Sequence, residues 1–329
     1  MKRAWTALLI TLAAVLPARF YAAFRLVDPK TGFYTDGGRI AGAAAIVALA
    51  GAVLAAAFGR RKAQPKTREP LRSVSAAVFA ALSGAFVAGQ AVVSLADAGG
   101  PSPLNVVLAL FGVCAAASFL TAAYDFASGS TVLRQHPLVA LLVPLWGCLR
   151  LVSLFVSYAA VVDRFENVYH TFTVVLLLLF LFSQAKLLTG VDEDRGGRMI
   201  FLYGFPAIVA ALTDSLPNLA LLFAGQKTLG AFPAGLFFAN AVLAVYLIVY
   251  LAAEGKRRIA LPMVAIEPDF QEDGGESDGQ PAEPESREEA HLPSPEDPEP
   301  QYLDFLEKAY HGGYKFSEHG AYSSGHLKS

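Results

Sequence analysis

The sequence predicts an all-α protein, a polytopic transmembrane bundle of about eight helices followed by a largely disordered acidic C-terminal tail. Three observations predict this class. The 329 residues are 54% hydrophobic and only 16% charged, whereas a soluble domain carries about 25% charged residues. The apolar residues gather in continuous runs, each long enough for the roughly 20 residues that a spanning helix needs. More than half of the acidic residues follow the last run, so a membrane domain over 1–255 precedes a polar tail.

The apolar runs favour helices because they are continuous, whereas a membrane β-barrel has alternating segments of about ten residues. A helix also satisfies its own backbone hydrogen bonds within lipid. The predicted spans are residues 4–24, 40–59, 74–95, 104–124, 137–162, 168–189, 199–225 and 231–253. Lys2 and Arg3 before a short apolar core are also compatible with a cleaved signal peptide. We favour a retained helix, because apolar and aromatic residues continue through Phe24.

The distribution of lysine and arginine predicts that both termini are cytoplasmic, in a multi-pass cell-membrane protein. One set of connections carries 15 basic residues, and the alternate set carries six. The richer set is Lys2, Arg3, Arg60, Arg61, Lys62, Lys66, Arg68, Arg72, Arg134, Lys186, Arg195, Arg198, Lys256, Arg257 and Arg258. Because the richer set stays in the cytoplasm, the number of spans is even.

Small residues recur every four positions in two predicted spans. The two ladders are Ala44, Ala48, Ala52 and Ala56, and Ala76, Ala80, Gly84 and Ala88. Small residues at this spacing let the backbones of neighbouring membrane helices approach closely. Each ladder therefore predicts a helix–helix contact.

Two ionisable residues, Arg150 and Asp214, lie deep within predicted spans, where they are the candidate binding residues. Their depths differ by only about 3 Å at 1.5 Å per residue, so the two could pair. Either they form a structural ion pair, or they belong to a polar site for an ion or solute, or they make no contact and reach water separately. Pro206 and Pro217 flank Asp214, and broken helices with polar groups occur at transporter sites. Additional polar lining could come from Gln90, Tyr158, Asn218 and Asn240.

Four other ionisable residues fall near span ends, where we expect water to hydrate them. They are Asp97, Asp125, Glu166 and His170. In the first external loop, Asp-Pro-x-x-Gly predicts a tight turn. Phe33 and Tyr34 beside it are expected at the membrane interface.

The tail is predicted to have three parts. Residues 256–300 begin with a basic stop and continue as an acidic linker, in which 267–299 hold 13 acidic residues and one basic residue. Such a composition predicts disorder. Residues 301–311 form a short amphipathic segment, and 312–329 are again disordered. The apolar and aromatic side chains of the segment could dock a cytoplasmic partner as a helix in a groove; they include Tyr302, Phe305, Leu306 and Tyr310.

The N-terminal part resembles a known group of proteins. Arg19-Phe20-Tyr21, followed by Asp28-Pro29, Thr31-Gly32-Phe33 and the aromatic Tyr34, is similar to the opening of uncharacterised polytopic membrane proteins of Clostridia-type Gram-positive bacteria. The resemblance implies a bacterial cytoplasmic membrane. It implies no activity and no functional residues.

No catalytic, nucleotide-binding or metal-binding motif is present in the sequence, so we expect no enzyme, no cofactor, no metal and no nucleic-acid partner. The expected contacts are membrane lipid and a cytoplasmic protein that binds the tail. The first hypothesis for function is sensing or scaffolding through the tail. The alternative is transport of a small solute or ion at a polar site around Arg150 and Asp214.

Overall fold

The computed structural model describes residues 2–28, 34–61, 70–95, 103–158, 165–191, 193–229 and 232–260. All of them belong to one compact unit, which ends at Ala265. The tail from 261 onward, with Tyr302, Phe305, Leu306 and Tyr310, lies outside the described residues, as do Asp97 and the turn at 29–33. The predictions made for these segments stay predictions.

The described residues form an all-α bundle with eight long apolar helices, as the sequence predicted. The helices are α1 (Lys2–Tyr21), extended by the π-helical η1 (Ala22–Leu26), α2 (Arg39–Arg61), α3 (Val74–Leu95), α4 (Pro103–Ser128), the short α5 (Val132–Gln135), α6 (Pro137–Tyr158), α7 (Phe165–Thr189), α8 (Glu193–Phe223) and α9 (Ala234–Ala260). The sequence missed η1 and α5. It also ended the last span at 253, whereas α9 continues through the basic residues, where Arg257 pairs with Glu254 at 2.6 Å.

The outside of the bundle is apolar. Examples of large hydrophobic side chains that face outward, each 59–71% exposed, are Leu9, Ile46, Val92, Leu110, Phe155 and Phe172. So much exposed apolar surface would be unstable in water but suits lipid. Together with helix length, it identifies the chain as an integral, multi-pass membrane protein.

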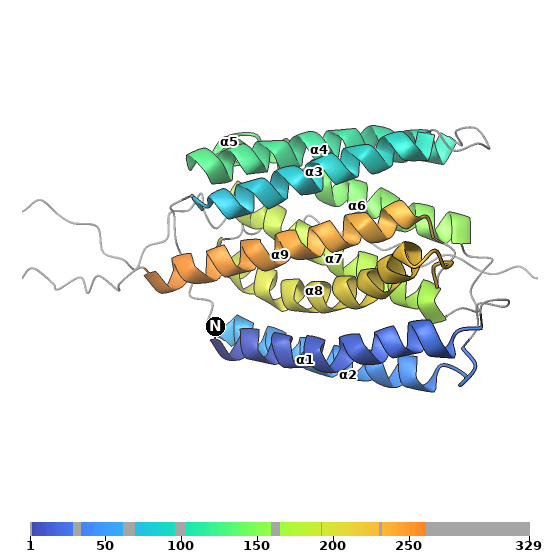
Figure 1. The fold of residues 1–329 in the computed structure, drawn as a ribbon. Coiled ribbons are helices and arrows are strands. Elements are labelled where there is room, and N and C mark those ends of the chain that lie inside the picture. Colours follow the sequence, from blue (N-terminus) through green and yellow to red (C-terminus); the bar gives the residue numbers. More distant parts are fainter. Residues whose placement is uncertain are drawn as a thin grey trace, which may run out of the picture. The chain divides into compact units, whose positions relative to one another are not determined.

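Six of the helices close a ring by their contacts, and α1 and α2 lie together along one side of the bundle (Figure 1). In the ring, α8 contacts α9, which contacts α3, and the contacts continue through α4, α6 and α7 back to α8. Outside the ring, α1 and α2 pack on each other and on α8. We call the end of the bundle where α1 begins the proximal end and the opposite end the distal end. The spans alternate in direction, so α6 ends and α7 begins at the distal end.

Helix α8 is the central element, because it contacts α1, α2, α7 and α9. It is also the most enclosed span, because 67% of its most apolar stretch is buried inside the bundle. It contains Pro206 and Pro217, and each proline removes one backbone hydrogen bond from the helix. A carbonyl that is freed in this way needs a donor from another helix.

The small-residue ladders lie at helix contacts. Ala44, Ala48, Ala52 and Ala56 are all buried on α2. On α3, Ala76 and Ala80 are fully buried, and a Cβ added at Gly84 would lie 3.0 Å from a backbone oxygen of α4. The prediction of close helix approach is confirmed at these positions.

The closest approach of α1 and α2 occurs at Gly51. A Cβ added there would overlap the Thr11 Oγ1 and would lie 2.8 Å from the Thr11 Cβ. Because the Thr11 Cβ is fixed by the backbone, rotating the side chain cannot remove the overlap. The helices themselves would have to move apart.

We therefore expect Gly51→Ala to destabilise the bundle by about 1–3 kcal/mol, the usual cost of overpacking. Gly42→Ala on the same helix is the matched control, because its added Cβ meets no atom within 4 Å and alanine is the better helix former. Thermal unfolding of both variants in detergent measures the difference. Equal melting temperatures for the two variants would contradict the packing described here.

Candidate functional site

The distal half of the bundle contains two groups of buried polar residues. The first, the Arg19 cluster, comprises Arg19, Tyr34, Glu166, Tyr169 and Thr213. The second, the Arg150 cluster, comprises Arg150, His170, Asp214 and Asn240. In the Arg150 cluster each side chain is at most 3% exposed. The two clusters adjoin because α7 and α8 contribute neighbouring residues to both.

The Arg19 cluster is built on an ion pair between α1 and α7. The Arg19 Nη1 and Nη2 atoms donate to the two carboxylate oxygens of Glu166 at 2.8 and 2.7 Å. The Arg19 guanidinium also lies 4.8 Å from the centre of the Tyr169 ring. A two-pronged contact of this kind combines strong hydrogen bonds with fixed geometry. It anchors α1 to the ring.

Pro217 explains the third contact of Arg19. A proline at 217 has no N–H to donate to the Thr213 carbonyl, four residues earlier. The Arg19 Nε atom donates to this carbonyl instead, at 3.3 Å. The Thr213 hydroxyl donates to the Val209 carbonyl at 2.6 Å, so its contact with the Tyr169 hydroxyl has tyrosine as the donor. Each N–H edge of Arg19 therefore has a partner.

The connection between α1 and α2 brings Tyr34 into this cluster. Val27 and Tyr34 form an antiparallel bridge, and the Thr35 N–H donates to the Leu26 carbonyl at 2.7 Å. The Tyr34 hydroxyl donates to Glu166. Burial, and then the nearby Glu166 carboxylate, raises the pKa of the Tyr34 phenol, which therefore stays protonated. The Tyr34 side chain is half-buried, and its hydroxyl joins the buried ion pair; its position at the membrane interface stays a prediction.

At the start of α2, Asp36 completes the connection. Its carboxylate accepts backbone N–H groups of Gly38 at 2.9 Å and Ile40 at 3.0 Å. The bond from Ile40, partly opposed by desolvation, lowers the pKa of Asp36. An ionised carboxylate at a helix N-terminus stabilises the first turn, and this turn holds Tyr34 in place.

The Arg150 cluster contains the pair of His170 and Asp214. The His170 Nδ1 lies 2.7 Å from an Asp214 carboxylate oxygen, and both side chains are at most 1% exposed. The imidazole stacks on Phe232 at 4.2 Å and meets the edge of Phe237 at 5.5 Å. Because Asp214 accepts from Nδ1, the other ring nitrogen is the basic one, and the buried His170 Nε2 has no partner. The site thus contains one free proton acceptor.

Arg150 is bound less completely than Arg19. Its Nη2 donates to the Asn240 carbonyl oxygen at 2.8 Å, and its guanidinium lies 5.6 Å from the Trp146 ring. Its buried Nε has no hydrogen-bond partner. Asp214 attracts Arg150 electrostatically, but among the described residues no direct ion pair joins them. The two predicted residues belong to one cluster, in which a carboxylate oxygen of Asp214 contacts His170 and not Arg150.

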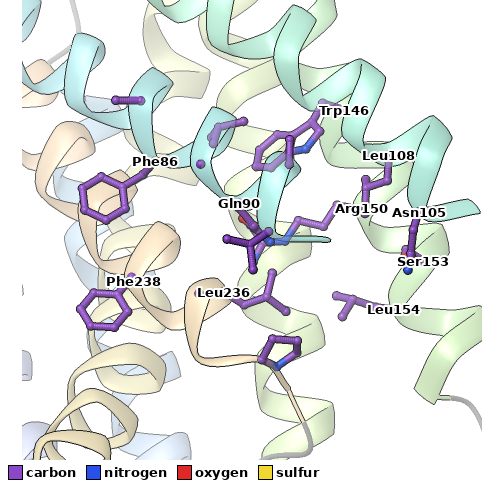
Figure 2. A pocket seen from close by; sticks show the side chains of 17 residues that line it. Phe86, Gln90, Asn105, Leu108, Trp146, Arg150, Ser153, Leu154, Leu236 and Phe238 are labelled. Carbon is purple, nitrogen blue, oxygen red and sulfur yellow. The ribbon is translucent and has the colours of Figure 1, made fainter. Parts of the chain in front are cut away.

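Arg150 also lines a cavity of about 570 Å³ in the distal half of the ring. The cavity is walled by α3, α4, α6 and the start of α9, and most of its lining is apolar. Figure 2 shows Gln90 and Arg150 projecting toward the middle of the lining, with Phe86 and Phe238 to one side and Ser153 to the other. The buried Gln90 Oε1 also lacks a hydrogen-bond partner. The cavity therefore joins an apolar wall to polar atoms that have unused hydrogen-bonding capacity.

The proximal half of the ring is filled instead. The Gln184 side chain donates to the Tyr246 hydroxyl across the ring. Phe119 packs edge-on against Tyr246 at 5.8 Å, and Phe180 against Tyr250 at 6.0 Å. A pocket beside Tyr246 holds only about 20 Å³. The interior of the bundle is thus hollow at its distal end and packed at its proximal end.

Three residues that we expected to be hydrated are buried, so that expectation is wrong. Glu166 is 5% exposed, His170 is 0% exposed and Asp125 is 6% exposed. Asp125 accepts the backbone N–H groups of Val132 at 3.0 Å and Leu133 at 2.9 Å, which begins α5. Distance from the span end misled the assignment, because a helix that begins beside three others is enclosed from its first turn. The i, i+4 spacing of Glu166 and His170 on one face of α7 was the available signal.

The other predicted polar residues are placed as follows. Asn240 and Gln90 belong to the site, whereas Asn218 holds the connection to α9 by accepting the Leu229 N–H at 2.8 Å. The side chain of Tyr158 is outside the described residues. Among the described residues, no group of three His, Cys, Asp or Glu side chains could hold a metal ion.

Comparison with protein-family models, with curated proteins and with solved structures finds no match for the chain. The function must therefore be argued from the geometry.

The ion pair of the Arg19 cluster yields a test of what holds α1 to the ring. We expect Glu166→Gln to destabilise the bundle by about 3–5 kcal/mol, because it leaves the buried Arg19 charge without a counter-ion. The double variant Arg19→Met with Glu166→Met should regain most of this loss, since neither charge remains buried. Thermal unfolding in detergent measures both variants. A double variant no more stable than Glu166→Gln would contradict the role of charge.

Proposed function

We propose that this integral membrane protein is a transporter for a small amphipathic organic anion, which binds in the distal cavity at Arg150. The proposal develops the alternative that the sequence left open, a polar site around Arg150 and Asp214. The observation that carries it is a buried arginine with an unpartnered Nε atom in the wall of a cavity that is otherwise mainly apolar.

The charge of Arg150 supports an anionic substrate. A guanidinium in a low-dielectric interior needs counter-charge and hydrogen-bond acceptors. Asn240 supplies one neutral acceptor, whereas Asp214 lies in contact with His170 and makes no direct hydrogen bond to Arg150 among the described contacts. A carboxylate, sulfonate or phosphate in the cavity would complete the bonding of Arg150. The Trp146 ring beside the guanidinium also stabilises the positive charge of Arg150 itself.

The shape and lining of the cavity support an amphipathic substrate. Its 570 Å³ falls within the range of about 300–1,000 Å³ that is usual for small-molecule pockets. The apolar wall from Phe86 and Phe238 to Leu236 offers space for a hydrocarbon or aromatic group. Gln90 and Ser153 add polar atoms near Arg150. A purely inorganic ion would leave the apolar volume unused.

The unequal filling of the two halves supports transport rather than storage. Alternating access requires a site that opens toward one side while the other side is closed. The packed layer of Tyr246, Tyr250 and Phe119 is consistent with a site that is closed toward the proximal side. The lysine and arginine distribution predicts that the proximal end is cytoplasmic. The distal cavity would then lie toward the outer side of a bacterial cell membrane. We propose no catalytic role for any residue of the site.

The site is tested most directly with Trp146 as a reporter. Trp5 and Trp146 are the two tryptophans of the chain, so Trp5→Phe leaves Trp146 as the single tryptophan, with its ring 5.6 Å from the Arg150 guanidinium. In this background, reconstituted in nanodiscs, ω-bromodecanesulfonate should quench Trp146 fluorescence saturably. Arg150→Gln should weaken its binding about 10- to 100-fold, since hydrogen bonds to charged groups contribute about 1.5–3 kcal/mol.

Three controls make the result specific. The neutral ω-bromodecanol should bind wild type and Arg150→Gln equally, and Arg150→Lys should retain part of the sulfonate affinity. Gly235→Leu should block both probes, because its added Cβ starts in open space within the cavity lining. In proteoliposomes, uptake of the sulfonate should follow its affinity. Saturable sulfonate binding that Arg150→Gln leaves unchanged would refute the proposal.

A further inference from the structure

We propose that His170 is a proton-binding site whose protonation controls the anion site. One proton at His170 and one anion at Arg150 are then bound and transported together. This inference rests on the proposed function and adds its regulation. It comes from the position of Asp214: the carboxylate contacts the His170 imidazole directly, and that ring meets Phe237 of α9. One turn further along α9, Asn240 accepts a hydrogen bond from Arg150, whose guanidinium Asp214 attracts.

The formal charges of the cluster give the reason. When His170 is neutral, the charges of Arg150 and Asp214 cancel, and the buried cluster is neutral without a ligand. When His170 is protonated, the cluster carries one net positive charge. Binding of one anion at Arg150 then restores neutrality. Because uncompensated charge is costly inside a membrane bundle, proton and anion should each raise the affinity for the other.

The geometry identifies the atom that accepts the proton. His170 Nδ1 carries the hydrogen that is donated to Asp214 across 2.7 Å. The incoming proton therefore binds to the lone pair of the buried Nε2, which has no partner. The resulting imidazolium and Asp214 neutralise each other, and the pull of Asp214 on Arg150 weakens. Arg150 is then available to the anion.

Among the titratable groups around His170, we assign the pH response to the pair of His170 and Asp214. On α7 itself, Glu166 is one turn away, but its carboxylate is bound by the two terminal nitrogens of Arg19 from α1. Tyr169 also lies on α7 and donates to Thr213. From α8 the facing titratable group is Asp214, and from α6 the charged group of the cluster is Arg150. At the start of α9 the ring contacts of His170 are Phe232 and Phe237, which do not titrate.

The experiment measures the dissociation constant of ω-bromodecanesulfonate between about pH 5 and 8, where imidazoles titrate. A sulfonate is used because its own charge is constant across this range. In the Trp5→Phe protein in nanodiscs, the constant should rise with pH by up to about tenfold per unit, the limit for one linked proton. Binding of the neutral ω-bromodecanol should stay flat.

Two variants should fix the site in opposite states. His170→Gln cannot be protonated, so Asp214 keeps compensating Arg150, and the sulfonate should bind weakly at every pH. Asp214→Asn removes the competing carboxylate, so the sulfonate should bind tightly with little dependence on pH. The control is His136→Gln, because His136 is exposed near the proximal end; this variant should keep the wild-type profile.

The wild-type profile decides the inference even where a variant fails to fold. Sulfonate binding that depends on Arg150 but is constant with pH would overturn the proton linkage and leave the proposed function intact. A pH profile retained in His170→Gln would also overturn it. Absence of saturable sulfonate binding at every pH would overturn both proposals.

Discussion

A charge placed in a membrane bundle must find its partner inside the protein, and this constraint governs the arrangement of the distal half. Helix α8 carries Asp214 and a carbonyl freed by Pro217, and neither could face lipid. The first is matched by His170 and the second by Arg19. The helices α1 and α7 therefore have to lie beside α8. The ring and the position of α1 on its outside follow from this matching as much as from apolar packing.

The two polar clusters differ in how completely they are bonded, and this difference separates structure from function. Arg19 has a carboxylate on two nitrogens and a carbonyl on the third, so each of its nitrogens already has a partner. Arg150 has one neutral acceptor and an adjoining cavity. The same residue type thus fastens helices in one place and offers a binding surface in the other. Burial alone would not distinguish them.

The sequence predicted the bundle well because apolar run length and charge placement are local properties. It also identified Arg150 and Asp214, since ionisable residues in the middle of a span stand out. It misplaced Glu166 and His170, because depth within a span says nothing about neighbours, and these residues are enclosed by helices distant in sequence. The hydrogen bond from Arg19 to the Thr213 carbonyl joins residues 194 positions apart. The periodicity within one segment cannot reveal such a contact. It cannot reveal the cavity either, because four helices form the cavity together.

The order of synthesis gives the Arg19 ion pair a consequence for assembly. Helices α1 and α2 leave the ribosome long before Glu166 and Thr213 exist, so the nascent hairpin enters the bilayer with an arginine that has no partner. Until α7 and α8 follow, the Arg19 side chain must stay near lipid headgroups and water, at the distal end of its helix. Docking of the N-terminal hairpin is thus a late step of biogenesis. A chain interrupted before α8 would keep that hairpin undocked and recognisable to membrane quality control.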